Sequence, residues 1–299
     1  MSDAPQSGQS EPDQPESNQA ADAGPPIDPE TGEDLSWKQV PMTFVLLDRP
    51  APSRDEVNEL LAEVFEGAFE VRPGTDEEPA TAVLVEDATV MVTPIDSPIP
   101  DGEASRYTAD LAMWGGKEAV VDTHRSQVVV AAFRWGPPGD DGEPTEPEYM
   151  DPREETLRCE LAVANVTAAL TALPGAVAVS VGGAAATLPA GPYRELVAGN
   201  PIPAPALVGV RVGMQSESTS AGYTTGLGRF GRMDLERIEV LAPPAAVYGQ
   251  LCDLVAYSLA SSTIFVPGQS IDVGNAETLV AEAVPSAFTG QETLRLRPA

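Results

Sequence analysis

The chain has 299 residues, enough for one large domain or two smaller ones and for a sizeable core. Its 46 acidic and 17 basic residues give a formal net charge of -29 at pH 7. Nucleic acids and anionic membrane surfaces are therefore poor partners, because binding to phosphates requires clustered Lys and Arg. No apolar run approaches the ~18 residues of a membrane-spanning helix, and the N-terminal residues lack the basic and apolar regions of a signal peptide, so we expect a cytoplasmic protein.

The first 38 residues form a distinct segment. Residues 1–34 contain nine acidic and no basic side chains, and Ser, Gln, Pro and Gly supply most of the remainder. A segment with so little apolar surface cannot offset the entropy that it loses on ordering, so we predict a disordered acidic tail over residues 1–38. Such a tail would serve as a solubilising extension or as a binding arm for a basic partner.

Residues 39–135 carry strand and helix patterns that predict a first α+β half. The predicted elements, in chain order, are a buried strand at 42–47, an amphipathic helix that begins at the capping box Ser53–Glu56, a hairpin of 81–85 and 89–93, a short helix from Asp101 that carries Tyr107, Leu111 and Trp114, and a central strand at 127–133. The order β-α-β-β-α-β is the ferredoxin-like succession, which places helices on one face of an antiparallel sheet.

Residues 136–152 form an acidic loop rich in Pro and Gly, which we interpret as a linker or an insertion between the halves. The second half, residues 153–299, repeats the pattern of strands, hairpin and helices. Its predicted elements are a long helix at 153–173 buried on more than one side, a hairpin of 176–181 and 184–188, a short helix at 192–198, strands at 206–214 and 235–240, a helix that begins at Pro243-Pro244, an irregular stretch at 263–277, and an edge strand at 292–297. We therefore expect an α+β protein with two ferredoxin-like halves packed as one unit.

The two cysteines, Cys159 and Cys252, both fall within apolar helical patterns. A free cysteine behaves as a small apolar residue, so we expect two buried free thiols. One histidine and scattered carboxylates offer no ligand spacing typical of zinc or di-iron centres. The sequence therefore predicts no metal and no cofactor.

The run 222–240 combines four glycines with several arginines in a protein that has few cations. Gly226-x-Gly228-x-x-Gly231 matches the dinucleotide-binding fingerprint by letters, but it leads into a strand pattern where that fingerprint requires a helix. We therefore expect a tight turn that needs positive φ and a close backbone approach. Arg229 and Arg232 could form an anion-binding pair beside backbone amides, and Thr225 and Phe230 are further candidate binding residues of the same run.

Asp122 and His124 are the other candidate site residues. If they lie on a strand, positions i and i+2 share a face, and the aspartate could orient the histidine as a base. No nucleophile motif accompanies them, so a structural role for the histidine is favoured. The acidic residues Asp234 and Glu236 are interpreted as parts of a solvated face.

Residues 224–236, Thr-Thr-Gly-Leu-Gly-Arg-Phe-Gly-Arg-Met-Asp-Leu-Glu, resemble the signature of a bacterial family known as domain of unknown function 4261. The run 265–274 resembles the closing glycine turn of that family, with Pro-Gly-Gln-Ser in place of the more usual Asp-Gly-Asp-Thr. Pro98-Ile-Pro100, Trp114 and residues 122–125 also resemble it. The resemblance covers about residues 42–281 and implies a bacterial, intracellular protein, but it supplies no catalytic residue.

These observations favour a non-catalytic module that binds another protein, a basic one by charge, in an adaptor or immunity-type role. The alternative is a protein that binds a small ligand or anion, or an enzyme, that uses Asp122 and His124 with Arg229 and Arg232. A mimic of nucleic acid is a third possibility, although the excess negative charge is concentrated in residues 1–34 and 136–156.

Overall fold

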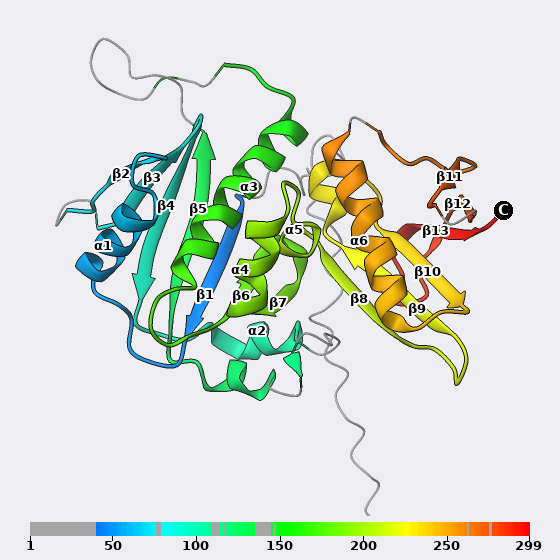
Figure 1. The fold of residues 1–299 in the computed structure, drawn as a ribbon, viewed down its shortest axis with the longest axis horizontal. Helices are drawn as coiled ribbons and strands as arrows, with labels where there is room; N and C mark the ends of the chain where they lie inside the picture. The colour runs from blue at the N-terminus through cyan, green and yellow to red at the C-terminus, as the bar shows by residue number, and fades with distance from the viewer. Residues whose placement is uncertain are drawn as a thin grey trace, which may run out of the picture.

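The computed structural model describes residues 40–75, 79–108, 114–115, 118–134, 145, 148–261, 263–274 and 277–299. The predicted acidic tail over 1–38 and most of the predicted loop over 136–152 lie outside these residues. Figure 1 shows two β-sheets side by side, each with helices packed on it. No helix in the described part of the chain is both long enough and apolar enough to cross a membrane.

The first sheet has seven strands in the order β2-β3-β4-β5-β1-β6-β7, and every neighbouring pair is antiparallel. The strands are β1 (Met42–Leu47), β2 (Glu70–Arg72), β3 (Thr81–Val85), β4 (Ala88–Ile95), β5 (Ser126–Arg134), β6 (Ala176–Val181) and β7 (Ala186–Pro189). One face is covered by the helices α1 (Arg54–Val64), α3 (Pro152–Leu170) and α4 (Ala190–Gly199) (Figure 1).

The other face of this sheet is partly covered by α2 (Glu103–Arg106) and the 3₁₀ turn Glu118–Thr123. Leu46 of β1 packs there against Trp114, whose indole N–H donates to the carbonyl oxygen of Thr187 at 3.2 Å. Val45, which precedes Leu46, belongs to the core beneath the helices on the opposite face. Strand β1 is therefore buried on both faces, which explains its apolar run from Phe44 to Leu47.

The second sheet has six strands in the order β11-β12-β13-β10-β9-β8, and only the β10–β13 pair is parallel. The strands are β8 (Gly209–Met214), β9 (Ser220–Thr225), β10 (Leu235–Val240), β11 (Ser270–Asp272), β12 (Thr278–Pro285) and β13 (Glu292–Pro298). Helix α6 (Pro244–Ala260) packs on one face of this sheet, and the short helix α5 (Ala204–Leu207) lies beside it.

Each sheet and the helices packed on it form a lobe of the molecule, and helix α3 packs against both lobes. Val163 and Val166 pack into the core of the first sheet, whereas Leu157 and Ala164 pack against the core of the second. This confirms the prediction that the helix is buried on more than one side. Between the lobes the Glu160 carboxylate of α3 pairs with the Arg229 guanidinium at 2.6 Å, and the two side chains are only 2% and 6% exposed.

The α+β class and the antiparallel sheets are confirmed, but the ferredoxin-like strand order is wrong. That order places the first strand next to the hairpin, whereas here β5 separates β4 from β1. The boundary between the halves also differs, because β6 and β7 of the predicted second half extend the first sheet. The sequence pattern identifies β1 as a buried strand, but it does not show that β1 takes a second neighbour from residues 176–181.

Several smaller predictions need correction. The predicted edge strand at 292–297 is β13, which lies inside the sheet between β12 and β10. Part of the stretch predicted to be irregular, 263–277, forms β11. Residues 206 and 207 belong to α5, and the strand begins at Gly209. The predicted helix from Asp101 is reduced to α2, and Leu111 lies outside the described residues.

Replacing Arg229 with Ala should lower the free energy of unfolding by about 3–5 kcal/mol, because the carboxylate of Glu160 would remain buried without its partner. Replacing Arg158 with Ala should lower the free energy of unfolding by less than about 1 kcal/mol, because the ion pair of Arg158 with Glu154 is about half exposed. Urea unfolding followed by circular dichroism measures both. Equal, small losses for the two variants would show that the buried pair does not hold the lobes together.

Candidate functional site

The glycine-rich run forms the connection between strands β9 and β10, which are antiparallel neighbours. Gly226 and Gly231 flank the 3₁₀ turn Leu227–Phe230 with φ of 98° and 65°. A Cβ on Gly226 would lie 2.6 Å from the carbonyl oxygen of Gly183 in the first lobe. The predicted tight turn and close backbone approach are therefore confirmed, and a strand follows where a nucleotide-binding loop would need a helix.

Arg229 and Arg232 donate their hydrogen bonds to the chain itself. Arg229 pairs with Glu160 and donates to the carbonyl oxygen of Leu207, and its guanidinium lies 5.0 Å from the ring centroid of Phe230. Phe230 is buried in the core of the second lobe. Thr225 donates to the carbonyl oxygen of Ala184 at 2.7 Å. Arg229, Phe230 and Thr225 thus take part in packing at and near the junction between the lobes.

Arg232 closes the end of helix α6. Its guanidinium donates to the carbonyl oxygens of Ser258, Ser261 and Phe230 at 3.1, 3.2 and 2.7 Å. A cation at this end also opposes the negative end of the helix dipole. Burial, together with the nearby charge of Arg153, lowers the pKa of Arg232. These contacts use the donors with which Arg232 would bind an anion.

Asp122 and His124 lie away from this region, next to α2 on the first sheet. His124 accepts from the backbone N–H of Ile99 at Nε2, 2.9 Å away, so Nδ1 carries the proton and donates to the carbonyl oxygen of Val121 at 2.5 Å. Asp122 accepts from the hydroxyl of Ser105. Asp122 belongs to a 3₁₀ turn, not to a strand, so the expected shared face with His124 does not form.

The expectation that Asp234 and Glu236 are solvated is wrong. Glu236 is fully buried, pairs with Arg295 at 2.6 Å, and accepts from the Ser286 hydroxyl and the Ala287 N–H at 2.7 and 2.9 Å. Asp234 accepts from Thr224 and from two backbone amides of the glycine turn. Burial raises the pKa of Asp234, and these hydrogen bonds oppose the shift. Glu236 lies on β10, an inner strand of the sheet, and is therefore covered.

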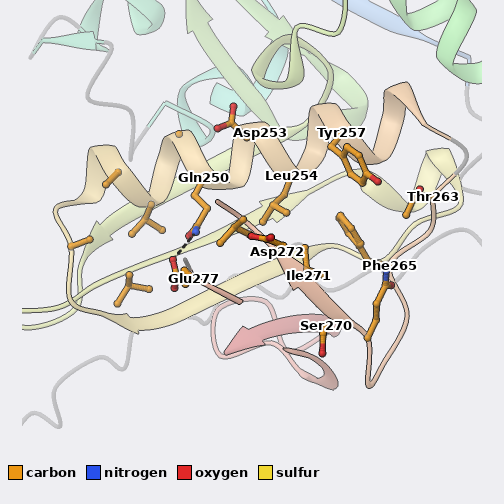
Figure 2. A pocket seen from close by; sticks show the side chains of 17 residues that line it. Gln250, Asp253, Leu254, Tyr257, Thr263, Phe265, Ser270, Ile271, Asp272 and Glu277 are labelled. Carbon is orange, nitrogen blue, oxygen red and sulfur yellow. Dashed lines mark hydrogen bonds between the residues drawn. The ribbon is translucent and has the colours of Figure 1, made fainter. Parts of the chain in front are cut away.

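A cleft of about 770 Å³ opens between helix α6 and the segment 263–273 (Figure 2). Figure 2 shows Gln250, Leu254 and Tyr257 extending from α6 toward this segment. Apolar and aromatic side chains supply much of the lining, and polar side chains stand among them. The lining comprises Val240, Ala242, Ala246, Val247, Gly249, Gln250, Asp253, Leu254, Tyr257, Thr263, Phe265, Gln269, Ser270, Ile271, Asp272, Val273 and Glu277.

One end of the cleft is fixed by a buried arginine. Arg237 of β10, only 2% exposed, donates to the carboxylate of Glu277 at 2.9 Å and to the side-chain oxygen of Gln250. Gln250 in turn donates to the other oxygen of Glu277 at 3.1 Å, the dashed contact in Figure 2. These contacts with the buried Arg237 fix the positions of Gln250 and Glu277, and the Glu277 side chain remains 40% exposed.

The cleft has an acidic and aromatic character. Its 17 lining residues include Asp253, Asp272 and Glu277 and no Lys, Arg or His. In Figure 2 the Asp253 side chain extends from the side of α6 away from Asp272 and Glu277. Tyr257 is 56% exposed, and its ring stacks on that of Phe265 with centroids 6.2 Å apart. Ile264 and Val266, which flank Phe265, are also exposed. An exposed apolar set beside carboxylates is suited to bind a segment that carries both apolar and cationic groups.

None of the six residues singled out from the sequence lines this cleft, and the structure places them in two separate groups. Sequence reasoning missed the cleft because residues 263–273 lack periodicity. The run Ile264-Phe265-Val266, apolar and next to a proline, was the available signal. Within the described ranges no group of three or more His, Cys, Asp or Glu side chains could hold a metal ion. No family model, curated protein or solved structure matches the chain.

Replacing Gly226 with Ala should destabilise the fold more than replacing Gly268 with Ala. Both glycines have positive φ, 98° and 83°, so each alanine costs about 1–2 kcal/mol of backbone strain. Only Gly226 faces backbone atoms of the other lobe, and the resulting overlap should add about 1–3 kcal/mol. Chemical unfolding of the two variants measures the difference. Equal losses would mean that the two lobes move apart without cost at this point.

Both cysteines are free, as predicted; Cys159 is buried and Cys252 half-buried. Burial raises the pKa of each thiol from 9.0 to about 12, which lowers the thiolate fraction near neutral pH about a thousandfold. A thiol-reactive maleimide at pH 7.5 should therefore label the native protein slowly and the urea-unfolded protein completely at two sites. Mass spectrometry counts the labels, and fast labelling of the native protein would contradict the burial of these groups.

Proposed function

We propose that the chain is a protein-binding module and that the cleft between α6 and residues 263–273 is its binding surface. The observation that carries this proposal is the composition of the cleft: the exposed Tyr257 beside buried apolar side chains, several acidic residues, and no basic residue among the lining. Tyrosine supplies a large contact area at a low entropic cost, and Tyr257 occupies such a position.

The proposed partner carries a segment with both apolar and basic side chains. The carboxylates of Asp272 and Glu277 would attract Lys or Arg, and the formal net charge of -29 would speed the encounter with a basic protein. The same charge disfavours a second copy of this chain as the occupant. Adaptor and immunity-type roles, which suit a protein as acidic as this one, remain part of this proposal.

The alternative site of Asp122, His124, Arg229 and Arg232 gains less support. The two guanidinium groups donate to a carboxylate and carbonyl oxygens of the chain, and His124 uses both ring nitrogens in contacts with the backbone. A ligand at any of these groups would have to displace hydrogen bonds that the fold already makes.

Selection from a displayed library of linear ten-residue peptides should enrich sequences that combine Lys or Arg with apolar residues. The double variant Tyr257→Ala, Asp272→Asn should bind a selected peptide at least about tenfold more weakly than the original chain, because it loses an aromatic contact and a charge. Fluorescence polarisation of the labelled peptide at two salt concentrations measures the affinity, which should fall as ionic strength rises.

The matched control is Tyr149→Ala, Glu217→Gln. It removes one exposed tyrosine and one exposed acid outside the cleft, so its affinity should equal that of the original chain. Failure of the library to yield any binding peptide, or equal weakening by the two double variants, would overturn the assignment of the cleft as the binding surface.

A further inference from the structure

We infer that the partner segment binds as an added β-strand along the outer edge of β11. This inference rests on the proposed function and specifies how the cleft would hold its occupant. Residues of β11 line the cleft, and β11 is the edge strand of its sheet, with β12 as its one neighbour among the described strands. An edge strand offers backbone groups that an extended segment can bind.

The register shows which backbone groups of β11 face outward. Ile271 lies opposite Leu279, and the flanking contacts run from the Val273 N–H to the Glu277 carbonyl at 3.1 Å and from the Ala281 N–H to the Gln269 carbonyl at 3.0 Å. In an antiparallel pair such contacts recur at every second residue. Gln269, Ile271 and Val273 therefore bond to β12, and the N–H and C=O groups of Ser270 and Asp272 point away from it.

The outward groups of Ser270 and Asp272 border the cleft, since both residues line it. A strand placed there would lie between β11 and α6 and would bring alternate side chains toward Leu254 and Tyr257 of the helix (Figure 2). The carboxylate of Asp272 lies within the same stretch, where it already accepts from the N–H of Gly274 at 2.9 Å. Basic side chains of the added strand would meet this end of the cleft.

The opposite edge of the same sheet is a poorer site. Near β8, Arg211 donates to the carbonyl oxygen of Ala185 at 2.9 Å, and a Cβ on Gly209 would overlap the carbonyl of Ala184. The first lobe thus lies against the beginning of β8. At β11 no contact of this kind with the first lobe is found among the described residues, and the cleft gives access to the edge.

A scan of backbone N-methylation along the selected ten-residue peptide tests the inference. A methyl group on an amide that donates to the carbonyl of Ser270 or Asp272 removes a hydrogen bond and blocks approach, so affinity should fall about tenfold at alternate positions and change less than about twofold at the positions between. The variant Ser270→Pro removes an outward N–H that β12 does not use, and it should weaken binding about tenfold while thermal unfolding of the chain stays near that of the original.

The outcomes separate the binding mode from the function. Losses spaced three or four residues apart, or a peptide insensitive to N-methylation and to Ser270→Pro, would overturn strand addition. If the double variant Tyr257→Ala, Asp272→Asn still weakens that peptide, the cleft remains the binding surface. A library without any binding peptide would remove both proposals together.

Discussion

The fold depends on one buried ion pair. Taking the charges of Glu160 and Arg229 out of water costs several kcal/mol each, and their attraction offsets this only if the two groups meet closely. Burial raises the pKa of Glu160, and the charge of Arg229 opposes that shift. Helix α3 and the turn after β9 must therefore approach within a narrow range of distances. Gly183 and Gly226 permit this approach, since a Cβ on Gly183 would overlap the guanidinium of Arg229.

Most arginines of the second lobe are likewise used in contacts within the fold. Arg229 and Arg237 are almost fully buried, Arg232 closes the end of α6, and Arg295 pairs with the buried Glu236. Four guanidinium groups are thus used to hold elements together. None of these arginines is among the residues that line the cleft, although Arg237 contacts Glu277 from beneath it.

Local features of the sequence predicted their structures well. The Ser53 side chain and Glu56 form the predicted capping box at the start of α1, and Gly226 and Gly231 of the glycine turn have the predicted positive φ. Relations between distant residues were not predictable, because strand pairing depends on partners that periodicity does not identify. Glu236 was predicted to be solvated because the partners that compensate for its burial, Ser286, Ala287 and Arg295, lie 50 or more residues later in the chain. The cleft was missed because it lies between a helix and a non-periodic segment.

The central position of β1 has a consequence for how the chain folds. This strand is the first of the described chain, yet its two neighbours are β5 and β6, the second of which ends at Val181. Contacts so distant in sequence close large loops and form slowly. During synthesis the backbone N–H and C=O groups along one edge of β1 stay unpaired until residues 176–181 have emerged from the ribosome. The growing chain is thus most prone to aggregation in the period before β6 pairs with β1.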